Sequence, residues 1–265
     1  LFTKELEHAL LRGEIDMAVH SMKDLPTELP GGLAIGAICQ RAHPGDVLIS
    51  REGKMLGELP EGALVGTSSL RRCAQLLHYR RDLKMTDLRG NINTRLRKLE
   101  EGHFDATVLA FAGVHRMGWD DRITQLIPFE ICLPAVGQGA IGVEVRADDE
   151  KVRNLVNKID HLESRQAITA ERAMLKKLEG GCQIPIGALG TLKNGRLNIE
   201  GVVASLDGKE LVRSSLVGDA GDAAGTGLRL AEMLIRLGAG DILNKIRQRD
   251  NGPVPLSRQE NGCHE

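Results

Sequence analysis

The cysteine at position 182 follows two glycines directly and stands three residues before a proline. The residues before it have the pattern of a long helix, which Gly180 and Gly181 would end because glycine tolerates positive φ. Pro185 would keep the helix from resuming. Cys182 is therefore expected on a tight loop, where its thiol could act as a nucleophile or carry a covalently bound group. The alternative is an inert thiol that fills a turn.

Seven arginines lie between residues 71 and 97, with few acidic residues to offset them. Four of these follow predicted strand ends, in a loop or in the first turn of a helix: Arg71, Arg72, Arg89 and Arg95. A cation in the first turn opposes the helix dipole, so another role must explain its place. The guanidinium fork suits carboxylates and phosphates. No GxxxxGK[ST] loop is present, which favours carboxylates. The alternative, a solvated helix face, is accepted for Arg80, Arg81 and Arg97.

The pair Lys23-Asp24 follows a short apolar run, Ile15–Val19, that is predicted to be a buried strand. Ligands of α/β folds bind at the carboxyl ends of strands. A carboxylate there could stabilise a cationic intermediate or move protons, whereas the alternative is a surface ion pair of little energetic value. His20 is expected to be a core histidine, and the histidine spacing predicts no metal site.

The composition restricts the class of protein. The chain has 265 residues, enough for two or three domains, and a net charge of −1 that gives no global attraction to nucleic acid or anionic membranes. Aromatic residues make up 2%, which argues against base stacking. Of the 35 basic residues, 23 are arginine. Five cysteines lie far apart and fit neither a disulfide framework nor a CxxC metal site, so a reducing cytosol is expected.

The order of predicted elements indicates α/β lobes followed by an α+β unit. Turn-like stretches around residues 41–46 and 134–139 are candidate crossings, which suggests that the chain leaves a first domain, builds a second and returns. The expected domains are residues 1–41 with 139–158, residues 45–134, and residues 160–265. In the last, three strand-like runs are separated by the hairpin signals Asn194-Gly195 and Asp207-Gly208.

Five segments, in this order, resemble signature segments of the porphobilinogen deaminase (hydroxymethylbilane synthase) family: VHSMKDLP at 19–26, GTSSLRR at 66–72, LRGNINTR at 88–95, LPAVGQG at 133–139 and EGGCQIP at 179–185. The resemblance implies two doubly wound lobes like those of type II periplasmic binding proteins. It also implies a small C-terminal α+β domain with a three-stranded antiparallel sheet.

The same resemblance implies an activity. Cys182 would carry a dipyrromethane cofactor through a thioether, and four porphobilinogens would be added head to tail, each losing ammonia. Water would then release hydroxymethylbilane. A growing chain of acetates and propionates would explain the arginines. Loss of ammonia leaves an electron-poor methylene, which a carboxylate beside the pyrrole N–H stabilises.

The resemblance also implies roles for single residues. Asp24 would be the catalytic carboxylate, assisted by Lys23. Substrate or cofactor binding is implied for Cys182, Lys23, Ser69, Arg71, Arg72, Arg89, Gly90, Arg95, Arg116 and Arg146. Arg71, Arg89, Arg95 and Arg116 would bind substrate. No metal is expected.

The family has a segment before the position of Leu1 that supplies the first strand and helix of domain 1, a further arginine and a glycine-rich loop, and this sequence does not contain it. A cytoplasmic monomer that binds neither nucleic acid nor membranes is expected. The alternative function is a non-catalytic binding protein whose hinged lobes close on an anionic small molecule. That alternative explains the arginines and leaves Asp24 and Cys182 unexplained.

Overall fold

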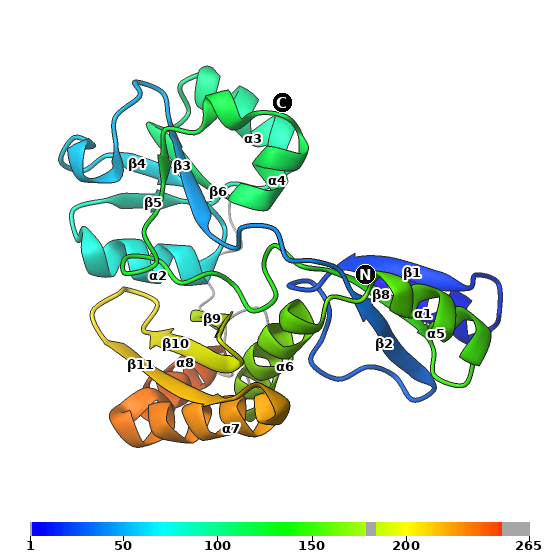
Figure 1. Cartoon of the computed structure of the whole chain (residues 1–265). Helices are drawn as coiled ribbons and strands as arrows, with labels where there is room; N and C mark the ends of the chain where they lie inside the picture. Colours follow the sequence, from blue (N-terminus) through cyan, green and yellow to red (C-terminus); the bar gives the residue numbers. More distant parts are fainter. Residues whose placement is uncertain (1, 179–183, 251–265) are drawn as a thin grey trace.

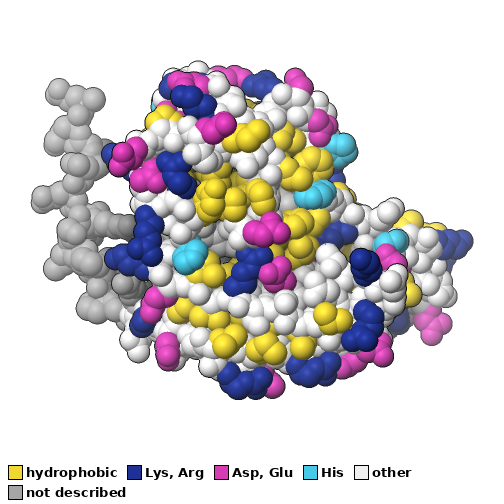
Figure 2. All heavy atoms as spheres, turned by 60° about the vertical axis from the view of Figure 1, so that its left-hand side comes forward, with side chains coloured by type: hydrophobic (Ala, Val, Ile, Leu, Met, Phe, Trp, Pro, Cys, Tyr) yellow, Lys and Arg dark blue, Asp and Glu magenta, His cyan; other side chains and the backbone are white. Residues whose placement is uncertain are grey.

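The computed structural model describes residues 2–178 and 184–250. These residues form three groups of helices and strands, each built around its own sheet (Figure 1). Among the helices of this part of the chain, none is long and apolar enough to cross a membrane. Figure 2 shows acidic and basic side chains intermixed over one face, without a continuous basic patch on that face.

The first group contains a three-stranded sheet in the order β1-β8-β2, in which β8 runs antiparallel to both neighbours. Its elements are α1 (Phe2–Leu11), β1 (Met17–Ser21), β2 (Leu33–Ile38), β8 (Ile141–Arg146) and α5 (Glu150–Val156). Val143, Val145 and Val156 form part of its apolar core. His20 is buried on β1, as expected, and its Nε2 lies 3.0 Å from Oε2 of the fully buried Glu144.

The second group surrounds a five-stranded sheet in the order β5-β4-β6-β3-β7. Its elements are β3 (Asp46–Ser50), β4 (Leu64–Gly66), α2 (Leu70–Tyr79), β5 (Lys84–Thr86), α3 (Ile92–Glu100), β6 (Ala106–Ala110), α4 (Phe111–Arg116) and β7 (Gln125–Leu126). The strands β5, β4 and β6 are parallel, and β3 pairs antiparallel with β6 and β7. Parallel strands whose sequence order is 2-1-3 form the centre of a doubly wound sheet.

The third group has the expected antiparallel sheet of three strands, in the order β11-β10-β9. Its elements are α6 (Leu162–Lys177), β9 (Ile186–Lys193), β10 (Arg196–Ala204), β11 (Leu211–Asp219), α7 (Ala223–Leu234) and α8 (Gly240–Asp250). Asn194 and Gly195 both have positive φ, at 52° and 72°, and form the tight turn between β9 and β10 that their sequence predicted. The predicted fold class, α/β lobes with a small α+β unit, is confirmed.

The chain passes twice between the first two groups, and the two crossings lie against each other. The amide of Ala42 donates to the carbonyl of Gly139 over 3.2 Å. A methyl group on Gly139 would approach the carbonyl oxygen of Ala42 to 2.6 Å, and one on Gly137 would approach the carbonyl carbon of Met22 to 2.8 Å. Both glycines also have positive φ, which is 86° for Gly139 and 76° for Gly137. The exact domain boundaries expected near these crossings stay a prediction.

Candidate active site

A cleft of about 470 Å³ lies where the three groups meet, and we call it the junction cleft. Lys23 and Asp24 enter it from the turn after β1, and residues of α2 and α3 line it from the second group. Leu175 and Ile184 line it from the C-terminal group. The residues of the second group in its wall include Ser68, Ser69, Arg71, Arg72 and Arg95. Three groups of elements that are separate in sequence therefore contribute to one space.

A second cleft of about 320 Å³, the lobe cleft, adjoins the first. It is lined by the start of α3, by α4 with Arg116, and by Gly139 of the second crossing. Five residues line both clefts and form a shared wall: Lys23, Asp24, Arg72, Arg95 and Gln138. The two clefts therefore meet at the pair that the sequence identified as a catalytic candidate.

The turn that carries Lys23 and Asp24 is held by an arginine that the sequence analysis did not single out. Arg172, on α6, donates from Nη1 to the carbonyl of Leu25 over 3.2 Å and from Nη2 to the carbonyl of Pro26. Burial between the cleft walls lowers the pKa of Lys23, while the Asp24 carboxylate opposes this effect. Nothing in the local sequence marks Arg172, because it lies in the middle of an amphipathic helix.

Arg71 and Arg72 are both buried, 5% and 6% exposed, and both bind Asp46 at the start of β3. Arg71 donates from Nη1 to Asp46 Oδ2 and to the carbonyl of Leu133, each over 2.7 Å. Arg72 donates from Nε and Nη2 to Asp46 Oδ1 over 3.0 and 2.7 Å, and from Nη1 to the carbonyl of Val108. Asp46, which is fully buried, was not predicted as a site residue from the sequence.

The remaining predicted residues of the two clefts lie at or near the ends of helices. Ser69 is the N-cap of α2 and accepts from the amide of Arg72. Arg95 donates from Nε to the carbonyl of Gly90 over 2.8 Å, and Gly90 has a φ of 115° that glycine permits. Burial lowers the pKa of Arg95, and the neighbouring positive charge of Arg72 adds to the shift. Arg116 donates to the carbonyl of Gly139 over 3.3 Å.

Two predicted arginines line neither cleft. The side chain of Arg89 is 87% exposed and pairs with Asp87 over 3.0 Å. Arg146 donates to the carbonyls of Leu10 and Ile15 and pairs with Asp16 and Asp149. Its partners therefore join α1, the loop before β1 and the start of α5.

Cys182 lies outside the described residues, as do Glu179, Gly180, Gly181 and Gln183. The ends of that segment are described. Leu178 is buried in the core of the third group, and Ile184 lines the junction cleft. Both neighbours of the segment are thus fixed, one of them at the cleft wall.

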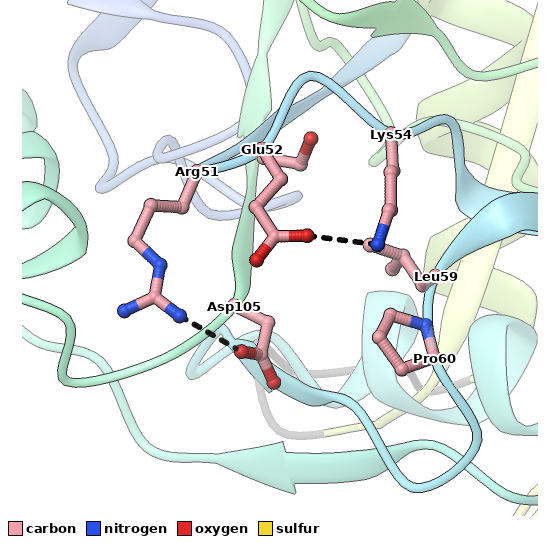
Figure 3. A pocket seen from close by; sticks show the side chains of 7 residues that line it. Arg51, Glu52, Lys54, Leu59, Pro60 and Asp105 are labelled. Atoms are coloured by element: carbon pink, nitrogen blue, oxygen red, sulfur yellow. Dashed lines mark ion pairs between the residues drawn. The ribbon is translucent and has the colours of Figure 1, made fainter.

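A small pocket of about 20 Å³, large enough for one water molecule, lies elsewhere in the second group (Figure 3). Lys54 and Glu52 pair over 2.8 Å at its edge, and Arg51 and Asp105 pair over 3.6 Å. None of the predicted site residues lines it. Within residues 2–178 and 184–250, no group of three or more His, Cys, Asp or Glu side chains is arranged to hold a metal ion.

Comparison with known proteins identifies the family. Residues 1–154 match the model described as "Porphobilinogen deaminase, dipyromethane cofactor binding domain", and residues 165–236 match "Porphobilinogen deaminase, C-terminal domain". The chain belongs to the porphobilinogen deaminase family. It is 72% identical to the porphobilinogen deaminase of Pelotomaculum thermopropionicum over 94% of this chain and 80% of that protein. The corresponding enzyme of Desulforudis audaxviator is 59% identical over 93% of this chain and 80% of that protein.

A solved structure of an ancestral cationic amino acid solute binding protein superposes with a TM-score of 0.42 and 15% identity, over 66% of this chain and 69% of that one. Similarity at this level adds nothing to the fold described above.

Membership of the family confirms the activity that the motifs implied. The chain is a transferase of tetrapyrrole biosynthesis that joins four porphobilinogens on a dipyrromethane cofactor and releases hydroxymethylbilane. The alternative, a hinged binding protein without catalysis, is not favoured. The donor set of the clefts fits the cofactor, because two pyrrole rings with acetate and propionate groups require several carboxylate-binding cations, and Arg71, Arg72 and Arg95 line the junction cleft.

Proposed function

We propose that the junction cleft holds the dipyrromethane cofactor, attached by a thioether to the sulfur of Cys182. The observation that carries this proposal is that Leu175 and Ile184, on either side of the segment containing Cys182, both line the cleft. Cys182 lies two residues before Ile184 in the sequence, and two residues of extended chain span at most about 7 Å. When bound, the cofactor supplies a pyrrole with a free α-carbon, to which the first porphobilinogen is joined.

The arginines of the shared wall and of the two clefts bind the carboxylates of the cofactor and the growing chain. Lys23, Ser69, Arg71, Arg72 and Gly90 are proposed for cofactor binding. Arg95 and Arg116 line the lobe cleft and are proposed to bind the incoming substrate. Arg71 is proposed to contact substrate carboxylates as well. Each contact of this kind is a charge-assisted hydrogen bond that positions the ring before reaction.

Arg89 and Arg146 do not line either cleft, so binding of substrate or cofactor would require their side chains to move. Arg89 would have to leave Asp87 and turn toward the cleft beside its neighbour Gly90 to bind substrate or cofactor. Arg146 would have to give up two carboxylates and two carbonyls. We therefore keep Arg89 and Arg146 as candidates that would bind substrate or cofactor after rearrangement.

Asp24 is the proposed catalytic residue. Porphobilinogen loses its aminomethyl nitrogen as ammonia, which leaves a methylene conjugated to the pyrrole nitrogen and a positive charge shared between them. A carboxylate beside the pyrrole N–H stabilises that charge. Coupling of this methylene to a pyrrole α-carbon would release a proton from that carbon, and Asp24 would accept it. Lys23 lines the shared wall beside Asp24, where burial lowers the pKa of its ammonium group, and is proposed to assist Asp24.

The division into two clefts suits stepwise elongation. A new porphobilinogen enters the lobe cleft, the reaction takes place at the shared wall, and the joined rings move toward the junction cleft. Release of the product would take place at the same wall: the bond between the product's first methylene and the cofactor would break, the cofactor carbon would regain a proton, and water would add to the methylene as a hydroxyl group.

We further propose a cytoplasmic monomer without nucleic-acid or membrane partners. Three described cysteines, Cys39, Cys73 and Cys132, are free thiols, which suits a reducing compartment. Acidic and basic side chains are intermixed on the face that Figure 2 shows.

The first experiment is the intact mass of the purified chain and of its peptide containing Cys182. We expect an excess that corresponds to two linked pyrrole units on that peptide. Cys182→Ser should abolish the excess and the turnover of porphobilinogen, whereas Cys39→Ser, at another free thiol, should leave both unchanged. An unmodified Cys182 in a chain that still forms hydroxymethylbilane would overturn the proposed attachment.

A further inference from the structure

Asp46 lies beneath the arginine pair of the clefts but lines neither cleft itself. It is fully buried, and its two oxygens accept hydrogen bonds from Arg71, Arg72 and Gln138. The two arginines hold the pKa of this carboxyl well below its usual range although burial alone would raise it. Asp46 therefore carries a negative charge in the folded protein, directly between two positive charges.

The two arginines use this carboxylate differently. All three guanidinium nitrogens of Arg72 donate within the protein, two of them to Asp46 and one to the carbonyl of Val108. Arg71 makes its hydrogen bonds to Asp46, Leu133 and Cys132 through Nη1 alone. Its Nε is buried, and no residue of the described chain accepts from it. A buried donor without an acceptor is costly, so this edge of Arg71 is suited to an oxygen supplied by a ligand.

Gln138 fixes the position of Asp46 from the other side. Its Nε2 donates to Asp46 Oδ1 over 2.9 Å and to the carbonyls of Pro44 and Gly45 over 2.6 and 3.3 Å. Gln138 is itself 1% exposed and belongs to the second crossing. Its three acceptors belong to the first crossing and to the start of β3. Contacts with both crossings thus hold the carboxylate in the position from which it orients the two arginines.

We propose that Asp46 is the positioning residue of the arginine pair, and that it directs the unpaired edge of Arg71 toward a carboxylate of the pyrrole chain. The proposal rests on the function assigned above to the two clefts. Without the negative charge, two adjacent buried guanidinium groups would repel each other, and Arg71 would lose the acceptor that holds its Nη1. The arrangement also leaves a net charge of +1 on the three side chains, so the clefts remain attractive to anions.

The test is Asp46→Asn, which keeps the shape of the side chain but removes its charge and replaces one acceptor with a donor. Kinetic constants are expressed per molecule that carries the cofactor, as measured by intact mass. We expect the KM for porphobilinogen to rise about tenfold or more, because a charge-assisted hydrogen bond that is no longer aligned contributes less to substrate binding. We expect a smaller change in kcat. A merely structural role would reduce the yield and the Tm and leave the KM of the surviving enzyme unchanged.

Two further variants complete the design. Gln138→Met removes the amide that holds Asp46 but leaves the charge of Asp46, so a smaller rise in KM is expected. This variant tests the inference if Asp46→Asn does not fold. Asp82→Asn is the matched control, because Asp82 accepts from Nε and Nη2 of Arg80 over 2.7 and 2.6 Å in the second group and lines neither cleft. Its KM should equal that of the wild type.

A KM within twofold of wild type in the folded Asp46→Asn and Gln138→Met proteins would overturn the inference. A wild-type chain that carries no cofactor and consumes no porphobilinogen would instead contradict the proposed function.

Discussion

Arg41 and Glu171 form a bidentate ion pair that joins the first crossing to helix α6. Nη1 of Arg41 donates to Glu171 Oε1 over 2.5 Å, and Nη2 donates to Oε2 over 3.2 Å. The same carboxylate accepts from the amides of Gly137 and Gly190 over 2.8 and 2.7 Å. One fully buried side chain thus joins both crossings and β9 to the helix that leads toward Cys182.

Removing this carboxylate should destabilise the protein strongly. Glu171→Ala leaves Arg41 as a nearly buried charge without its partner, so we expect the free energy of unfolding to fall by about 3–5 kcal/mol. Glu100→Ala removes an exposed partner of Arg122 and should cost at most about 1 kcal/mol. Urea unfolding of the two variants tests the difference. Equal effects would show that the buried pair adds no more stability than a surface pair.

Asp24→Asn should reduce kcat while the cofactor stays attached. The amide keeps the shape of the side chain but does not stabilise a cation, so we expect a decrease of about 10²–10³-fold. Steady-state kinetics with porphobilinogen and the mass of the Cys182 peptide provide the measurement. Asp16→Asn, which changes an exposed carboxylate that pairs with Arg146, is the control and should leave kcat unchanged. A kcat within tenfold of wild type for Asp24→Asn would remove this residue from the catalytic step.

Arg95 and Arg97 lie two residues apart on α3 and should differ in function. Arg95 lines both clefts, whereas Arg97 is exposed and approaches Glu101 only to 3.7 Å. Arg95→Leu should raise the KM for porphobilinogen about tenfold or more because it removes donors for a substrate carboxylate. Arg97→Leu should leave the KM unchanged. Similar values for the two variants would contradict the proposed binding role of Arg95.

Glu144→Gln should change how stability depends on pH. Burial raises the pKa of Glu144 above its ordinary value of 4.5, the neighbouring His20 opposes this shift, and Glu7 adds to it. Between the unfolded and folded pKa values the native state binds more protons, so the contribution of Glu144 to stability is complete below the unfolded pKa. That contribution is lost as the pH rises through the folded pKa.

The variant lacks this titration. The free energy of unfolding of Glu144→Gln minus that of the wild type should therefore increase as the pH rises above about 4.5. Chemical denaturation at a series of pH values measures the difference, which also cancels the contributions of other titrating groups. A difference that stays constant from acid to neutral pH would contradict the raised pKa.

Most helices and strands could be predicted from the sequence because their signals are local. The turn between β9 and β10 lies where Asn194-Gly195 predicted it, since the signal for such a turn is contained in two adjacent residues. The strand β7 was not predicted. It has only two residues, Gln125 and Leu126, and it exists because β3 offers an edge for pairing. No periodicity within two residues can indicate such a strand.

The motifs name residues that the fold brings together, and the roles of these residues stay predictions. Lys23, Asp24, Ser69, Arg71, Arg72 and Arg95 meet in one cleft although up to 72 positions separate them in sequence. Asp46, Gln138 and Arg172 were missed as supports of this site because each acts through contacts with distant segments. Arg146 pairs with Asp16 and Asp149 in the described structure, and its predicted role in cofactor binding stays a prediction.

The packing of the second crossing has a genetic consequence. A methyl group on Gly137 or Gly139 would meet backbone atoms within 3 Å, and both residues have a positive φ. Every missense change of a glycine codon introduces a side chain, so none of the alleles that one nucleotide can produce at these two positions fits the structure. In a library of single-codon variants, these codons should stand out as sites where synonymous changes survive selection and amino-acid changes do not. Such a pattern would be visible in sequencing counts alone, without purification of any protein.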